Sequence, residues 1–182
     1  MRCDSTNAGD RGQQRAFLEE EHHEHLDRTA DFLYLCTMSL SALYFHLVIR
    51  TKNGKMTLPE QHKPGLYAYM AGIVAKRDCK AVKINGIANH IHLLIRVTPS
   101  MVFSDLVHDL KLGATHYIKT HRADFPDFEG WGKEYAVFSC SASDLTRIIQ
   151  YITNQELHHE NVSAEDEMKH FCGMAGIEYY EL

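Results

Sequence analysis

The sequence predicts an α+β protein with a ferredoxin-like plan, in which a four-stranded antiparallel sheet carries helices on one face. Two observations lead to this prediction. Four short apolar segments alternate in the manner of β-strands, and two longer segments between them repeat apolar residues at helical spacing. These six segments follow one another in the order β-α-β-β-α-β, and a third helical segment comes after them. A chain of 182 residues is long enough for one domain with a substantial core.

The first strand and the first helix are expected before residue 77. In residues 42–50 every second residue is apolar and would face the core: Leu43, Phe45, Leu47 and Ile49. The pair Asn53-Gly54 ends this pattern, because both residues favour turns. A helix is expected over residues 60–76, where apolar side chains recur every three or four positions.

The third strand, at residues 90–97, carries the most distinctive pattern of the chain. It follows a second strand at residues 79–87, in which Asn85-Gly86 indicates a turn or bulge. Alternation places His90 and His92 on one face, together with Leu94 and Arg96. The other face is the expected core face and carries Ile91, Leu93, Ile95 and Val97. Two imidazoles at this spacing can hold one metal ion. A pair of hydrogen-bonded histidines on a half-buried sheet would show the same pattern.

The last elements follow in the second half of the chain. A helix is expected at residues 102–120, a loop at 121–132, a strand at 134–140 and one long helix at 144–159. On this last helix the apolar stripe consists of Leu145, Ile148, Ile149 and Ile152. Tyr151 and Gln155 lie one turn apart beside that stripe, so both could reach the two histidines if the helix lay against the sheet.

Charge and cysteine content limit the possible environments and partners. The formal net charge is −5, but residues 41–140 hold 13 basic and 8 acidic residues, which permits a polyanion partner there. The cysteines are scattered and never in C-x-x-C spacing, which favours a reducing cytoplasm over a disulfide framework. The uncharged stretch at residues 32–49 contains several polar residues and the start of a strand pattern, so no membrane span is expected.

Two motifs resemble those of one protein family. His90-Ile91-His92 resembles the His-hydrophobic-His motif of HUH endonucleases. Residues 151–155, with Tyr151 and Gln155 at their ends, resemble the Tyr-x-x-x-Gln motif of the single-tyrosine HUH transposases, which include small insertion-sequence transposases and REP-associated tyrosine transposases. The resemblance covers roughly residues 40–160. Two places depart from the family pattern: Asn89 stands where many relatives carry Asp, and Ser141-Ala142-Ser143 stands where many carry Gly.

The resemblance implies a transposase that cleaves and rejoins single-stranded DNA through a 5′-phosphotyrosine intermediate on Tyr151. It further implies a divalent ion, Mg²⁺ or Mn²⁺, on His90, His92 and Gln155. Zinc would need a third strong nitrogen or sulfur ligand, which His159 could in principle supply. Three basic residues are candidates for phosphate contacts, although each could equally be an ordinary surface charge: Lys52, Arg96 and Lys111.

The resemblance also implies partners and a division of the chain. The expected partners are single-stranded DNA, with hairpins at the element ends, and a second copy in a homodimer with composite active sites. We expect an extension at residues 1–37 outside the catalytic fold, a catalytic domain at 38–160 and an acidic tail at 161–182, with Met38 as a candidate internal start. Two other functions remain open: a non-catalytic module that binds single-stranded nucleic acid, and a metal-dependent nuclease that uses water.

Overall fold

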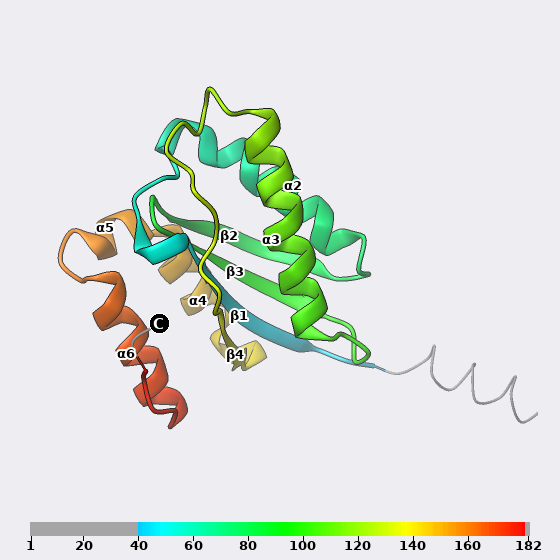
Figure 1. Cartoon of the computed structure of the whole chain (residues 1–182). Helices are drawn as coiled ribbons and strands as arrows, with labels where there is room; N and C mark the ends of the chain where they lie inside the picture. Colours follow the sequence, from blue (N-terminus) through cyan, green and yellow to red (C-terminus); the bar gives the residue numbers. More distant parts are fainter. Residues whose placement is uncertain (1–39, 181–182) are drawn as a thin grey trace, which may run out of the picture. The chain divides into compact units, whose positions relative to one another are not determined.

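The computed structural model describes residues 40–180, and from Ser41 onward they form one compact unit (Figure 1). The predicted extension at residues 1–37 and the candidate start Met38 lie outside the described residues. The first six elements have the predicted order, and their bounds are β1 Leu43–Arg50, α2 Lys63–Ala75, β2 Lys80–Ile87, β3 His90–Val97, α3 Phe103–Thr120 and β4 Ala136–Cys140. Three short helices follow: α4 Leu145–Thr153, α5 Gln155–His159 and α6 Ala164–Ala175.

The four strands form one sheet in the order β2-β3-β1-β4, and every neighbouring pair is antiparallel. The strands that carry the alternating patterns, β1 and β3, lie in the centre. This arrangement confirms the predicted ferredoxin-like plan. One of its consequences is that His92 of β3 lies directly opposite Val48 of β1, which puts the histidine pair in the middle of the sheet.

Helices α2 and α3 cover one face of the sheet and enclose the core (Figure 1). The core-facing residues of β3 are all buried in it, as alternation predicts: Ile91, Leu93, Ile95 and Val97. From the helices, Leu66 and Met70 of α2 meet Leu106 and Leu110 of α3 in the same cluster. Complete burial of such side chains stabilises the fold by roughly 1.5–3 kcal/mol each.

The prediction of one long helix at residues 144–159 is wrong in one respect, because the helix is interrupted at Asn154 and forms α4 and α5. The Asn154 backbone leaves helical geometry, with φ −98° and ψ 25°. Two side-chain hydrogen bonds act at this point: the amide of Asn85 on β2 donates to the Thr153 carbonyl at 3.0 Å, and the Thr153 hydroxyl donates to the Ile149 carbonyl at 2.7 Å. Both compete with the regular helical hydrogen bonds and so favour a bend.

The connection between β2 and β3 also differs from the prediction. The turn lies at Ala88 and Asn89, whereas Asn85 and Gly86 belong to β2 itself. A side chain at Gly86 would collide with the backbone of His90, so glycine allows β2 to approach β3 closely beside the first histidine. None of the helices between residues 40 and 180 is long and apolar enough to span a membrane.

Candidate active site

His90 and His92 lie on the face of the sheet opposite the core, where side chains of α4, α5 and α6 lie against them. Both side chains are buried. The Nδ1 atom of His90 lies 2.7 Å from the side-chain oxygen of Asn89, to which it can donate its proton. This hydrogen bond leaves the Nε2 atom of His90 free to act as a ligand. Asn89 therefore orients the ring although the family pattern favours Asp at this position.

His92 is oriented by a second imidazole. Its Nδ1 atom lies 2.8 Å from the Nε2 atom of His46 on β1. Burial, together with the smaller effect of the neighbouring His92, lowers the pKa of His46 to about 3. Burial likewise lowers the pKa of His92 to about 4, against the opposing effect of Glu167. Both imidazoles are thus neutral at pH 7, and the neutral form is the one that binds metals.

Tyr151 and Gln155 reach the histidines from α4 and α5. The Gln155 side chain is fully buried, and its oxygen lies 3.4 Å from His90 Nε2. The Tyr151 ring lies edge-on to His92, with 6.0 Å between the ring centroids. Because α5 begins at Gln155, the break at Asn154 sets how this side chain enters the site. The structure thus brings together all four residues that the two sequence motifs contain.

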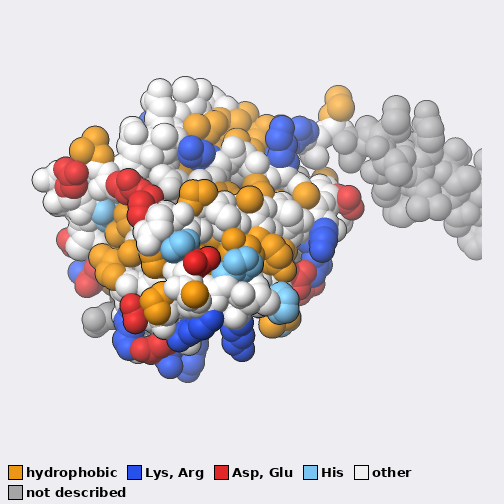
Figure 2. All heavy atoms as spheres, turned by 90° about the horizontal axis from the view of Figure 1, so that it is seen from above, with side chains coloured by type: hydrophobic (Ala, Val, Ile, Leu, Met, Phe, Trp, Pro, Cys, Tyr) orange, Lys and Arg blue, Asp and Glu red, His pale blue; other side chains and the backbone are white. Residues whose placement is uncertain are grey.

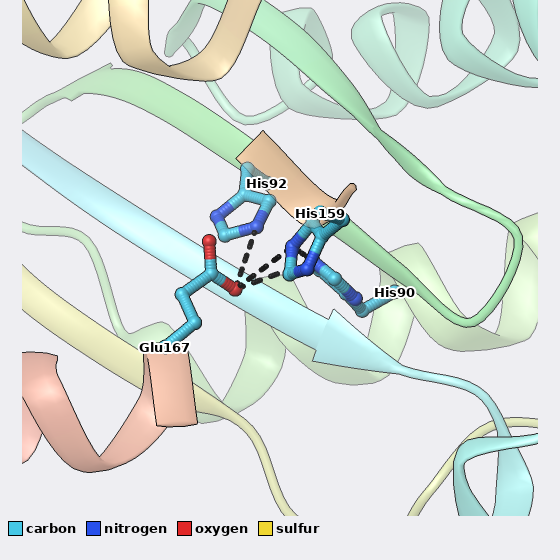
Figure 3. A group of neighbouring side chains, drawn as sticks. All are labelled: His90, His92, His159 and Glu167. Atoms are coloured by element: carbon cyan, nitrogen blue, oxygen red, sulfur yellow. Dashed lines mark hydrogen bonds and ion pairs between the residues drawn. The ribbon is translucent and has the colours of Figure 1, made fainter. Parts of the chain in front are cut away.

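Helix α6 adds Glu167, which the sequence analysis missed. Its Oε2 atom lies 3.3 Å from His90 Nε2 and 3.4 Å from both His92 Nε2 and His159 Nε2 (Figure 3). Its Oε1 atom accepts hydrogen bonds from the Tyr151 hydroxyl and from the Gln155 amide, the latter at 3.1 Å. The only sequence signal was an acidic residue one turn before Phe171, whose ring packs near His46 and Tyr151.

Burial and charge act in opposite directions on this carboxylate. Burial by itself would raise the pKa of Glu167, but the imidazoles of His159, His90 and His92 beside it outweigh this effect and hold the pKa well below its ordinary value. Burial raises the pKa of the Tyr151 hydroxyl, and the hydrogen bond to Glu167 raises it further. At neutral pH the site therefore contains a carboxylate beside a neutral phenol.

The group formed by His90, His92, His159 and Glu167, here called the metal cluster, fits a divalent ion. Its four ligand atoms all lie within 4.8 Å of one another. Two of them, His92 Nε2 and Glu167 Oε2, are buried and lack a hydrogen-bond partner among the described residues. Buried polar atoms without partners are costly, and an ion between them would satisfy both.

The three basic residues predicted to contact phosphate occupy different positions. Lys111 donates to the backbone carbonyls of Gly132, Lys133 and Glu134 at 2.8–3.0 Å, so it holds the segment before β4. Arg96 is exposed and donates to the Ser41 carbonyl. Lys52 lines a cavity beside the start of β4.

Two cavities flank the metal cluster. The first has a volume of about 420 Å³, and its lining includes Arg50, Lys52, Trp131, Lys133 and Tyr135. The second has a volume of about 570 Å³, and its lining includes Phe138, Arg147, Tyr151, Glu167 and Phe171. On the face that Figure 2 shows, histidine side chains lie among hydrophobic ones near the middle, and most lysine, arginine and acidic side chains lie nearer the edge.

Comparison with known proteins identifies a family and a fold. A family model described as an IS200-like transposase matches residues 39–155. The chain is similar to the crystal structure of a candidate transposase from Deinococcus radiodurans R1, with 26% identity, coverage of 65% of this chain and 94% of that chain, and a TM-score of 0.52. It shares its fold with a REP-associated tyrosine transposase bound to a REP hairpin, with 13% identity, coverage of 68% and 72%, and a TM-score of 0.52. No curated protein matches the chain significantly.

Proposed function

Since this chain belongs to the family of IS200-like transposases, we propose that it cleaves and rejoins single-stranded DNA with Tyr151 as the nucleophile. The observation that carries the proposal is the position of the Tyr151 hydroxyl. It is hydrogen-bonded to Glu167, whose other oxygen faces the histidines of the metal cluster. A phosphate bound at the cluster would thus lie next to a tyrosine, which is the arrangement that a transesterification requires.

In the proposed reaction, the Tyr151 oxygen forms a bond to the scissile phosphorus, and the bond from phosphorus to the 3′ oxygen breaks. The phenolic proton passes to water in the cavity beside Tyr151, the 3′ oxygen takes up a proton from water, and the DNA 5′ end remains attached to Tyr151. The 3′-hydroxyl of another strand can reverse the step without ATP. A phenol whose pKa lies above its usual value is a weak nucleophile at pH 7, so it needs help from its surroundings.

Part of this help would come from a divalent ion, Mg²⁺ or Mn²⁺, on His90, His92 and Gln155. When bound, such an ion polarises the phosphate and stabilises the charge that develops during the reaction. The chain contributes the orientation of the ligands, since Asn89 and His46 each hold one imidazole by its Nδ1 atom. Tight burial of His90, His92 and Gln155 excludes bulk water from this side of the reacting phosphate.

The proposed substrate is single-stranded DNA with hairpins at the element ends. The REP-associated neighbour was solved with a REP hairpin, which supports a nucleic-acid partner for this chain as well. The cavity with Arg50, Lys52 and Lys133 also contains Trp131 and Tyr135, a combination of positive charge and aromatic rings that suits single strands. We propose that Lys52 contacts phosphate there, and that Arg96 does so from its exposed position.

The proposed assembly is a homodimer with composite active sites. In the described chain, Tyr151 already lies beside its own His92, so a composite site would require α4 to leave this position. The connection Ser141-Ala142-Ser143 consists of small exposed residues, and α4 buries only Ile152 completely. Both features favour movement of α4 about this connection.

The proposal is tested by a search for a covalent protein–DNA adduct. We expect the wild-type chain, incubated with Mn²⁺ and hairpin-bearing single strands, to form an adduct whose digestion yields a DNA-linked peptide containing Tyr151. Cleavage with a free 5′-phosphate and no adduct would support the water-using nuclease instead. Binding without any cleavage would support a non-catalytic module.

A further inference from the structure

We propose that His159 of α5 and Glu167 of α6 are ligands of the ion together with His90 and His92, so that the chain itself supplies three imidazole nitrogens and one carboxylate. The His-His-Gln set of the family resemblance contains neither residue. The inference deepens the proposed function, because the catalytic use of the ion rests on that function. The ligand set itself can be measured without DNA.

The distances between the ligand atoms support this assignment. His90 Nε2 and His159 Nε2 lie 3.1 Å apart, and Glu167 Oε2 lies 3.3–3.4 Å from each of the three imidazole nitrogens. With metal–ligand bonds of about 2.0–2.1 Å, atoms at neighbouring corners of a tetrahedron lie roughly 3.3–3.4 Å apart. Four of the six distances therefore match a small ion at the centre of the cluster, and the two between His92 Nε2 and the other imidazole nitrogens are no longer than 4.8 Å.

The rings are also oriented for this role. His159 Nδ1 lies 2.7 Å from the Val162 carbonyl, and this hydrogen bond turns the Nε2 atom of His159 toward the cluster. His90 and His92 are held in the same manner by Asn89 and His46. All three imidazoles thus use Nδ1 for a hydrogen bond within the protein and present Nε2 to one point, as metal-bound histidines usually do.

Gln155 has a different position. Its oxygen lies 3.1 Å from His159 Nε2, and its amide nitrogen donates to Glu167 Oε1 at 3.1 Å. The amide nitrogen thus holds the carboxylate oxygen that does not face the imidazoles. We infer that Gln155 positions Glu167, and that its own oxygen can bind the ion as a fifth ligand.

The donor set predicts which ion binds. Imidazole nitrogen suits transition metals, whereas Mg²⁺ prefers an octahedral set of oxygen ligands and keeps several of its waters. Three nitrogens and one carboxylate should therefore bind Mn²⁺ much more tightly than Mg²⁺, and Zn²⁺ more tightly than Mn²⁺. Of the two ions implied by the resemblance, the cluster favours Mn²⁺.

Glu167 also makes α6 part of the active site. One oxygen faces the imidazoles and the other accepts the Tyr151 hydroxyl, so the carboxylate connects the ion site to the nucleophile. Ser163 caps the start of helix α6, because its hydroxyl oxygen accepts a hydrogen bond from the Asp166 backbone N–H. The side chain of Met168, next to Glu167, is buried. These contacts keep the helix, and therefore the carboxylate, in place over the sheet.

Calorimetry with Mn²⁺ and with Mg²⁺ tests the assignment on the full chain without DNA. We expect Glu167→Gln and His159→Asn each to weaken Mn²⁺ binding by at least about 100-fold, because the first replaces an anionic ligand by a neutral amide and the second removes an imidazole nitrogen. Matched controls are Glu165→Gln, an exposed acid on α6 that pairs with Lys169, and His116→Asn, an exposed histidine on α3. Both controls should bind Mn²⁺ as the wild type does.

Pulsed EPR of Mn²⁺ bound to the wild type gives a result that does not depend on how the variants fold. Three coupled imidazole nitrogens are expected, and two would overturn the role of His159. Unchanged Mn²⁺ affinity in the Glu167→Gln variant would overturn the role of Glu167, and equal affinity for Mg²⁺ and Mn²⁺ would overturn the predicted preference. If the ligand set holds but the wild type forms no DNA adduct, the proposed function fails and the metal centre remains.

Discussion

At the scale of single residues, the site depends on how a few polar side chains share their hydrogen bonds. His90 and His92 each have a partner on Nδ1, which leaves both Nε2 atoms directed at Glu167. Tyr151 and Gln155 donate hydrogen bonds to Oε1 of Glu167, the carboxylate oxygen that does not face the histidines. A change to any of these residues should therefore affect the chemistry more than the fold.

The first prediction concerns the nucleophile. Tyr151→Phe should abolish strand cleavage and adduct formation while DNA binding stays within a few-fold of the wild type, because only the hydroxyl oxygen is lost. Gel assays with labelled hairpin DNA measure cleavage and binding together. Tyr69→Phe, on an exposed tyrosine of α2 on the opposite face of the sheet, is the control and should leave cleavage unchanged. A Tyr151→Phe protein that still forms adduct would show that another residue attacks the DNA.

At the scale of elements, the break between α4 and α5 determines how the motif residues enter the site. The Asn85 side chain on β2 donates to the Thr153 carbonyl across 68 positions of sequence. This contact stabilises the bend, after which α5 places Gln155 in the interior. The relative position of Tyr151 and Gln155 therefore depends on β2 as well as on their own helices.

The second prediction follows from this contact. Asn85→Ala should lower the free energy of unfolding by roughly 1 kcal/mol, the usual net value of one hydrogen bond, and should weaken Mn²⁺ binding several-fold because Gln155 loses its fixed position. Urea unfolding and calorimetry measure the two effects. Lys80→Ala, at an exposed position of the same strand, should change neither. Equal stability and equal Mn²⁺ affinity in the Asn85→Ala protein would show that the bend does not depend on this bond.

At the scale of the whole molecule, burial of histidines links stability to pH. The folded protein holds His46 at a pKa of about 3 and His92 at about 4, both far below the value of 6.5 in an unfolded chain. Below pH 6.5 the unfolded chain therefore takes up protons that the folded protein does not bind. Stability should thus be complete above pH 6.5 and decline as the pH falls toward 4.

The third prediction gives this decline a magnitude. At pH 5, metal-free protein should be less stable than at pH 7.5 by on the order of 2 kcal/mol for each of His46 and His92. Glu167, whose pKa is lowered, adds to the loss below pH 4.5, whereas His159, whose pKa is raised, opposes it. Urea midpoints measured in EDTA at both pH values test this. His46→Gln should reduce the difference, and the exposed His108→Gln should not.

The fourth prediction concerns assembly. In a composite dimer, a mixture of Tyr151→Phe with a His90→Ala, His92→Ala double variant gives heterodimers with one site that carries both lesions and one that carries neither. We therefore expect cleavage to return after subunit exchange. A verified heterodimer that stays inactive would show that each site uses the tyrosine of its own chain, the arrangement in which Tyr151 lies beside His92 here.

The sequence by itself determined the sheet, its element order and two pairs of candidate site residues. Alternation in β1 and β3 depends only on neighbours along one strand, so the core face and the histidine face could be predicted from it. The two residue pairs are also local in sequence, because the members of each pair are only two to four positions apart: His90 with His92, and Tyr151 with Gln155. The family resemblance then connected the two pairs.

Only the tertiary structure decided what completes the site. The bend at Asn154 depends on Asn85, which belongs to β2. The orientation of His92 depends on His46, which lies 46 positions away in the sequence. Glu167 lies on α6 and contacts the sheet residue His92. Such contacts arise from packing between elements that are distant in sequence, and no local periodicity records them. The acid one turn before Phe171 was too weak a signal to predict a buried carboxylate, because a glutamate is normally exposed and becomes buried only where partners compensate its charge.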